Sequence, residues 1–189
     1  MRAAATGPST AQTASTAHAQ PGSHWPPQDL LTHLNRQLTR SYTRNGTFVT
    51  ACYAVLDPKT RTLTYSLAGH NPPRLVRHSE KRVISLDQQA MLPMGIDDDQ
   101  AYRQVTVTLE PGDLLLLYTD GITETMSAMT PQSATREMYG VERLDDHLLA
   151  CASGKAAEQC IQSVRTDVAR FANSAPPTDD QTLIALRCL

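Results

Sequence analysis

The stretch that decides the fold reads Leu114-Leu115-Leu116-Leu117-Tyr118-Thr119-Asp120-Gly121. Four consecutive leucines leave no polar side, so they predict a short strand that is buried on both faces and lies inside a sheet. The strand ends on a carboxylate and a glycine. A carboxylate held rigidly at the end of a buried strand suits Mg²⁺ or Mn²⁺, because these ions prefer oxygen ligands in fixed geometry. The alternative interpretation is a hairpin turn, for which Asp-Gly is a common signal.

Length and charge limit the classes of function. The chain has 189 residues, which is enough for one domain with a hydrophobic core. The formal net charge is -2, so no nucleic-acid-binding surface or membrane-surface charge is indicated. No apolar run reaches the roughly 18 residues of a membrane-spanning helix, and no signal peptide is recognisable. We therefore expect a cytoplasmic protein that binds neither nucleic acid nor membrane.

The four cysteines are scattered along the chain and never have the Cys-x-x-Cys spacing of a zinc site. We expect them to be reduced thiols, mostly buried, as in cytosolic proteins. They are Cys52, Cys151, Cys160 and Cys188.

The first 27 residues differ in composition from the rest of the chain. Residues 1–27 are rich in Ala, Thr, Ser, Gln and Pro, and they have no sustained apolar period. Such a segment buries too little apolar surface to offset the entropy lost on ordering. The sequence therefore predicts a disordered segment over residues 1–27 and one domain over residues 28–189.

Apolar periodicity predicts the elements of that domain. A helix capped by Asp29 is expected to carry Leu30, Leu31, Leu34 and Leu38 on one side. Two further helices are expected to begin near Tyr139 and Lys155, and residues 127–137 are expected to form an exposed flap. Strands are expected over residues 48–56, 62–68, 74–77, 83–86, 102–109, 114–117 and 183–186, the first two forming an antiparallel hairpin.

A second pair of carboxylates, Asp179 and Asp180, precedes the last expected strand. The end of the leucine strand, which carries Asp120, and the start of the last strand, which carries Asp179 and Asp180, could meet at one rim of a sheet and share a metal. The alternative is that Asp179 caps a turn and Asp180 is solvated.

Two other polar sites have competing interpretations. His70 beside Asn71 could be a general acid or a ligand, but we favour hydrogen bonding to loop backbone groups. The run Asp97-Asp98-Asp99 is interpreted as a solvated turn, since it lacks the spaced ligands and closing Glu of a calcium loop.

Seven short motifs occur together from about Asp29 to Leu189, and with them the chain resembles the PP2C-type (PPM) metal-dependent Ser/Thr phosphatases. The resemblance is to the bacterial SpoIIE/RsbU branch, and it implies an α+β fold in which helices flank a sandwich of two antiparallel sheets. The motifs are Phe48-Val49-Thr50, Ala68-Gly69-His70-Asn71-Pro72-Pro73, Leu92-Pro93-Met94-Gly95, Pro111-Gly112-Asp113, Tyr118-Thr119-Asp120-Gly121-Ile122-Thr123-Glu124, Tyr139-Gly140-Val141-Glu142-Arg143-Leu144 and Asp179-Asp180-Gln181-Thr182.

The resemblance also implies a function. Asp120, Asp179 and Asp180 match metal-binding positions for Mn²⁺ or Mg²⁺, and a metal-activated water would attack a phosphoserine or phosphothreonine directly. The expected substrate is a phosphorylated STAS-type anti-anti-sigma factor of a partner-switching pathway. Residues of secondary interest are Gly121, Glu124, His70 and Asn71.

One departure from the family pattern shapes these expectations. The family's G-D-x-x-D and G-D-x-x-G-H-G motifs are not found, and residues 1–28 contain no Asp or Glu. The resemblance thus covers the C-terminal two-thirds of the domain, and we expect an N-terminally truncated sandwich with an incomplete two-metal site. A second chain could complete the sheet. The alternative hypothesis is a catalytically inactive remnant that acts as a protein-interaction domain.

Overall fold

The computed structural model describes residues 24–41, 46–128, 135–151, 156–173 and 175–189. Eleven elements follow one another along this part of the chain. They are α1 (Pro27–Ser41), β1 (Ala51–Asp57), β2 (Thr62–Ala68), β3 (Arg74–Arg77), β4 (Arg82–Ser85), β5 (Gln104–Thr108), β6 (Leu114–Tyr118), α2 (Asp120–Thr123), α3 (Gly140–Cys151), α4 (Ala157–Phe171) and β7 (Leu183–Arg187).

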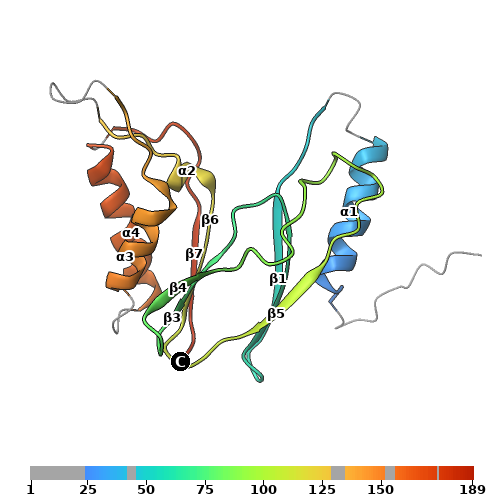
Figure 1. Cartoon of the computed structure of the whole chain (residues 1–189), viewed down its shortest axis with the longest axis horizontal. Coiled ribbons are helices and arrows are strands. Elements are labelled where there is room, and N and C mark those ends of the chain that lie inside the picture. The colour runs from blue at the N-terminus through green and yellow to red at the C-terminus, as the bar shows by residue number, and fades with distance from the viewer. Residues whose placement is uncertain (1–23, 42–45, 129–134, 152–155, 174) are drawn as a thin grey trace, which may run out of the picture.

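The strands form two antiparallel sheets with helices on both outer sides (Figure 1). One sheet has the order β1-β2-β5 and the other the order β4-β3-β6-β7. Helix α1 contacts β1 and β2, whereas α3 and α4 contact the second sheet. The layers are therefore helix, sheet, sheet and helices, which confirms the α+β sandwich predicted above.

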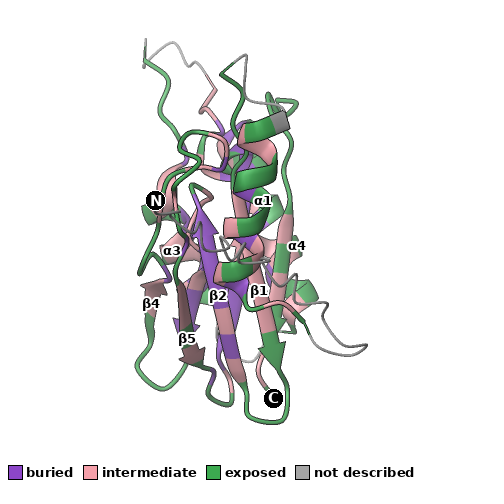
Figure 2. Ribbon diagram, turned by 90° about the vertical axis from the view of Figure 1, so that its right-hand side faces the viewer, coloured by how far each residue is buried: buried purple, intermediate pink, exposed green. Residues whose placement is uncertain are grey.

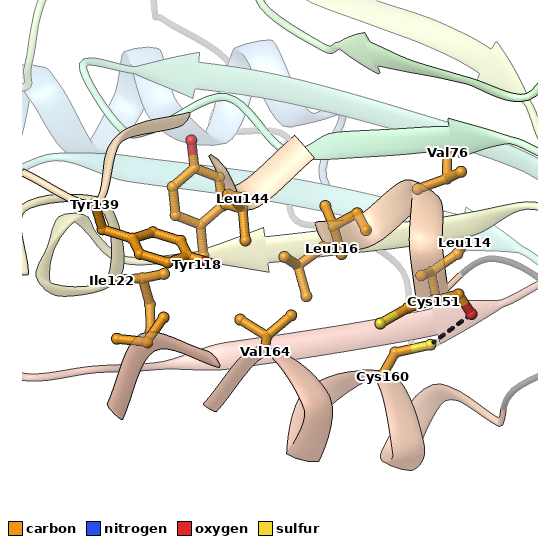
Figure 3. Close-up of a cluster of buried hydrophobic side chains, with 12 residues drawn as sticks. Val76, Leu114, Leu116, Tyr118, Ile122, Tyr139, Leu144, Cys151, Cys160 and Val164 are labelled. Atoms are coloured by element: carbon orange, nitrogen blue, oxygen red, sulfur yellow. Dashed lines mark hydrogen bonds between the residues drawn. The ribbon is translucent and has the colours of Figure 1, made fainter. Parts of the chain in front are cut away.

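The leucine run occupies the inside of the second sheet. Strand β6 pairs with β3 on one side and with β7 on the other. Leu114 and Leu116 face the core beneath α3 and α4, where Leu116 and Val164 point toward each other (Figure 3). Leu115 and Leu117 belong to the core between the sheets. One strand thus contributes to two cores, which is why its sequence has no polar side.

The first sheet is buried mainly along its central strand. Figure 2 shows β2 as the largely purple strand between β1 and β5. Leu63, Tyr65 and Leu67 of β2 are each at most 3% exposed and lie in the core between the sheets. Val105 and Val107 of β5 pack against the same core, as their alternation predicts.

Helix α1 differs from its prediction in two respects. It begins at Pro27, where a missing N–H costs nothing, and Asp29 lies in the first turn instead of capping it. Leu34 is 38% exposed, whereas Asn35 is fully buried. The Asn35 side chain donates to the carbonyl of Asp97 and accepts from the N–H of Gly95. These hydrogen bonds satisfy a buried amide, a role that hydrophobic periodicity does not detect.

Several other predictions can be compared with the described residues. Strand β1 begins at Ala51 and not at Phe48, because Val49 pairs only through an isolated bridge to Met94. Cys151 and Cys160 are buried free thiols, and Cys52 and Cys188 are half-buried.

Most of the expected disordered segment, residues 1–23, and the centre of the expected flap, residues 129–134, lie outside the described residues. Among the described helices, none is both long enough and apolar enough to cross a membrane.

A buried ion pair fixes the turn that leads into β6. Asp113 is 1% exposed, and its carboxylate accepts from the guanidinium of Arg77 at 2.5 Å. It also accepts from the backbone N–H groups of His78 and Glu110, at 2.9 and 2.8 Å. These three donors offset the loss of hydration, so the charge can be buried here.

The edge strand β7 presents apolar side chains to solvent. Leu183 and Ala185 pack against the core beneath the helices, so the alternation directs Ile184 and Leu186 to the opposite face. There Ile184 is 51% exposed and Leu186 is 37% exposed. Ile184 and Leu186 thus form an uncovered apolar face on an open sheet edge, which is suited to association with another chain.

We expect the protein to lose stability in alkali. Burial raises the pKa of both Tyr65 and Tyr102 to about 12. A raised pKa means that the folded state favours the neutral phenol. This stabilisation is complete below the ordinary tyrosine pKa of about 10 and is lost as the pH rises toward 12. Urea unfolding at successive pH values should show the decline, and Tyr65→Phe should reduce it. If the free energy of unfolding falls equally steeply with pH in the parent and in Tyr65→Phe, the assignment of this effect to Tyr65 is contradicted.

Candidate metal centre

The end of β6 and the start of β7 meet at one rim of the second sheet, because the two strands are antiparallel neighbours. Thr119, the residue after β6, donates its N–H to the carbonyl of Thr182 at 3.2 Å. Its hydroxyl donates to the carbonyl of Asp180 at 3.0 Å and accepts from the N–H of Thr182 at 2.9 Å. One threonine therefore ties the segment bearing Asp120 to the segment bearing Asp179 and Asp180.

Asp120 begins the short helix α2, which lies at the end of β6 (Figure 1). The alternative interpretation of Asp-Gly as a hairpin turn is wrong for this stretch. Gly121 is needed for a close approach: a Cβ at this position would lie 2.5 Å from the carbonyl oxygen of Asp180. The absent side chain thus lets α2 pack directly against the backbone of the second acidic segment.

Gln181 adds a third connection across the rim. Its side-chain amide donates to the carbonyl of Gly121 at 2.9 Å and to the hydroxyl of Thr125 at 3.0 Å. The Thr125 hydroxyl in turn donates to the same carbonyl at 2.8 Å. Neither Thr119 nor Gln181 had a predicted role of its own, although both stand beside the candidate ligands. Only the pairing of β6 with β7 reveals what these side chains do.

The carboxylates at the rim are exposed and only partly engaged. Asp120 accepts the N–H of Gly121 at 3.0 Å, and Asp179 accepts the N–H of Asp180 at 2.7 Å. Each of these two side chains keeps its other carboxylate oxygen for a further ligand. Within the described residues, no Lys, Arg or His forms an ion pair with Asp120, Asp179 or Asp180. Three uncompensated carboxylates in one place favour a bound cation.

The candidate ligands are of the right chemical type for a metal, but too few of their oxygens lie close together. The donors are hard oxygens, as Mn²⁺ and Mg²⁺ require. The carboxylate oxygens of Asp120, Asp179 and Asp180 do not all lie within 4.8 Å of one another, because in the described part of the chain only Asp97, Asp98 and Asp99 do so. Those three are exposed in a tight turn, as predicted. The assignment of Asp120, Asp179 and Asp180 as ligands stays a prediction.

The residues of secondary interest lie near the rim: His70 and Asn71 at the same end of the second sheet, and Glu124 beside α2. Strand β3 is antiparallel to β6, and Arg74 pairs with Leu116. The corner that holds His70 and Asn71 just before Arg74 therefore lies at the end where β6 leads to Asp120. His70 Nδ1 lies 3.3 Å from the hydroxyl of Thr50, so its hydrogen bond joins a side chain and not the loop backbone that we favoured. Glu124 is exposed directly after α2.

A groove of about 630 Å³ opens beside the rim. Asp179 and Asp180 line it together with Arg165 of α4. Arg165 had no predicted role, because it is one of many basic residues and belongs to no motif. Its position on the exposed side of an amphipathic helix becomes informative only once that helix is placed against the rim.

A second polar cluster joins α3 to α4. The Ser163 hydroxyl lies 3.0 Å from His147 Nε2, and His147 Nδ1 lies 3.6 Å from the carboxylate of Asp167. The order is that of a Ser-His-Asp triad, but Ser163 lies inside α4, where the backbone N–H groups are engaged in the helix. No oxyanion donors are therefore available from the helix backbone around Ser163. Asp167 instead accepts from the buried Tyr139 hydroxyl at 2.7 Å, which makes the cluster structural.

Solved structures share this fold. The SiaA-PP2C domain of Pseudomonas aeruginosa superposes with a TM-score of 0.69 and 22% identity, covering 86% of this chain and 60% of that domain. The Mn-presoaked phosphatase domain of the cell fate determinant SpoIIE from Bacillus subtilis gives a TM-score of 0.59 and 16% identity, over 92% and 79% of the two chains. A structure of RsbX in complex with magnesium gives a TM-score of 0.52 and 18% identity, over 83% and 62%.

The architecture is therefore that of PP2C phosphatase domains. Residues 2–189 match the family of Stage II sporulation protein E (SpoIIE), and the chain belongs to this family. The phosphoserine phosphatase RsbU of Bacillus subtilis (strain 168) is 26% identical over 162 residues, which cover 85% of this chain. The same alignment covers 45% of RsbU, so the chain spans less than half the length of this relative.

Proposed function

We propose that this chain acts as a metal-dependent phosphoserine/phosphothreonine protein phosphatase of the SpoIIE/RsbU type. The observation that supports the proposal most is the meeting of two strand ends at one rim, with Asp120 on one and Asp179 and Asp180 on the other. Family membership gives the reaction class, and the rim provides the acidic side chains that such a reaction needs.

Asp120, Asp179 and Asp180 would hold Mn²⁺ or Mg²⁺. The bound ion would lower the pKa of a coordinated water and offset the negative charge of the phosphoryl oxygens. The protein's own contribution is to keep the two acidic segments together. The Thr119 hydroxyl ties them by hydrogen bonds to backbone groups of Asp180 and Thr182, Gly121 permits their close approach, and Gln181 spans from one to the other.

The proposed substrate is a phosphorylated STAS-type anti-anti-sigma factor. The support is the similarity to RsbU, whose name describes a phosphoserine phosphatase. A protein substrate also agrees with the groove of about 630 Å³ beside the rim.

We expect Asp120→Asn to reduce Mn²⁺-dependent hydrolysis of a phosphoserine protein by about a hundredfold or more, since even residues that only orient metal ligands change metal affinity by 10- to 100-fold. Phosphate release over a range of Mn²⁺ concentrations, compared at the concentration that half-saturates the parent, measures the effect. Asp98→Asn is the matched control, because Asp98 is also exposed but belongs to neither of the two acidic segments at the rim. Equal rates for Asp120→Asn and the parent would contradict the proposal, as would the absence of turnover at every metal concentration.

A second candidate is a non-catalytic interaction domain. The exposed Ile184 and Leu186 on the edge strand β7 favour it, because an open apolar edge is suited to pairing with a strand of another chain. In this case the melting temperature would be the same in Mn²⁺ and in EDTA, and no phosphate would be released. A second chain that pairs with this edge could also complete the metal site.

A further inference from the structure

Two adjoining hollows run along α4. They share the lining residues Arg165, Pro177, Thr178 and Gln181, and together we call them the α4 groove. The first hollow, of about 630 Å³, contains the rim residues Asp179 and Asp180. The second, of about 670 Å³, is lined by Thr125, Arg136 and residues along α4 as far as Ala172. The α4 groove therefore borders the candidate metal centre and continues along α4.

The guanidinium of Arg165 is available for a ligand. Arg165 is exposed, and it forms no ion pair with any residue that the structure describes. It lines the same hollow as Asp179 and Asp180, yet neither carboxylate lies within ion-pair distance of it. By contrast, Arg170 on the same helix pairs with Asp167 at 3.0 Å.

A second cation adds to the charge of the groove. Arg136 lines the second hollow and likewise lacks an ion pair within the described ranges. The second hollow contains none of the three candidate ligands, although Thr125 and Gln181 of the rim also line it. The α4 groove thus carries carboxylates in its first hollow and guanidinium groups in both, a charge distribution that suits an anion placed between a metal ion and two arginines.

The remaining lining indicates what kind of molecule carries the anion. Ile161 and Leu183 line the first hollow, and Met126 and Ala172 line the second. Apolar surface beyond the charged groups suits the side chains that flank a modified residue in a polypeptide. A guanidinium presents a planar fork of donors that matches phosphate oxygens, so a phosphate is the anion best suited to Arg165.

We propose that the α4 groove binds the phosphorylated segment of a substrate protein, with Arg165 contacting the phosphate and determining specificity for it. This inference rests on the proposed phosphatase function and assigns the substrate-binding surface of the same site. Arg136 and the apolar lining contact residues of the segment on one side of the phosphorylated residue.

Binding of a short peptide to the full chain in EDTA tests the assignment without metal or turnover. The probes are a fluorescently labelled peptide of Gly, Ala and Leu around one phosphoserine, and the same peptide with serine. Fluorescence anisotropy should show preference for the phosphorylated peptide. Arg165→Gln should weaken its binding by about tenfold, which is typical for the loss of a hydrogen bond to a charged group. Arg170→Gln is the matched control and should bind as the parent does.

Each outcome decides the assignment. Preference for phosphoserine that is lost in Arg165→Gln and kept in Arg170→Gln supports the α4 groove. No binding by the parent, no preference for the phosphopeptide, or equal binding by Arg165→Gln overturns it. A chain that keeps the Arg165-dependent preference but releases no phosphate with Mn²⁺ would refute the proposed phosphatase activity and leave the groove assignment standing.

Discussion

Asp113→Ala should lower the free energy of unfolding by about 3–5 kcal/mol, the range for breaking one partner of a buried ion pair. The substitution leaves the guanidinium of Arg77, itself only 8% exposed, without its carboxylate. It also removes the acceptor for the N–H groups of His78 and Glu110. Urea unfolding followed by circular dichroism measures the change.

Glu110→Ala is the matched control for this prediction. The Glu110 carboxylate also faces Arg77, at 3.6 Å, but its side chain is 50% exposed. Exposed ion pairs contribute at most about 1 kcal/mol, so the control should be close to the parent. Similar losses for Asp113→Ala and Glu110→Ala would show that burial is not what makes Asp113 important.

Gly121→Ala should disrupt the rim, with a loss of about 1–3 kcal/mol in stability and a weakening of Mn²⁺ binding by about tenfold or more. The added Cβ would meet the carbonyl oxygen of Asp180 at 2.5 Å. That carbonyl belongs to the backbone and is held by the Thr119 hydroxyl, so the clash can be relieved only by separating the two acidic segments. Urea unfolding and metal titration measure the two effects.

Thr123→Ala tests whether the effect is specific to this contact. Thr123 lies in the same short helix, and its hydroxyl donates to the carbonyl of Asp120 at 3.3 Å. Its removal deletes a weak contact and adds no atom, so stability should change by about 1 kcal/mol or less and Mn²⁺ binding should be retained. If Gly121→Ala binds Mn²⁺ as tightly as the parent, the close approach is not required for the site.

The parts of the fold that follow from hydrophobic pattern could be predicted from the sequence. The run from Leu114 to Leu117 predicted a central strand, and the spacing of Val164 and Val168 predicted a helix with one buried side. Both conclusions hold because burial in these elements is dictated by apolar side chains, whose period is visible in the sequence. The hairpin of residues 51–68 was likewise predictable from two alternating runs around a turn.

Features that depend on polar groups from distant parts of the chain could not be predicted. Asn35 is buried because residues 95 and 97 supply its hydrogen-bond partners, and Asp113 is buried because Arg77 lies beside it. Neither partner is near in sequence, so local pattern treats both side chains as exposed.

The same limit applies to the candidate site. Asp120, Asp179 and Asp180 were predicted from their positions at strand ends and from family motifs, and the pairing of β6 with β7 explains why residues 60 positions apart meet. The roles of Thr119 and Gln181 depend on backbone carbonyls, and that of Arg165 depends on where α4 packs. Thr119 and Gln181 stand inside two of the quoted motifs, but a motif does not show which backbone groups a side chain contacts, and Arg165 belongs to no motif.

The most direct test of the central claim, that two strand ends form one metal site, is calorimetric titration of the full chain with Mn²⁺. We expect the parent to bind, and we expect Asp120→Asn and Asp179→Asn each to weaken binding by about tenfold or more, because the two residues serve the same ion. A parent chain that binds no Mn²⁺ up to millimolar concentration, or variants that bind as tightly as the parent, would contradict the claim.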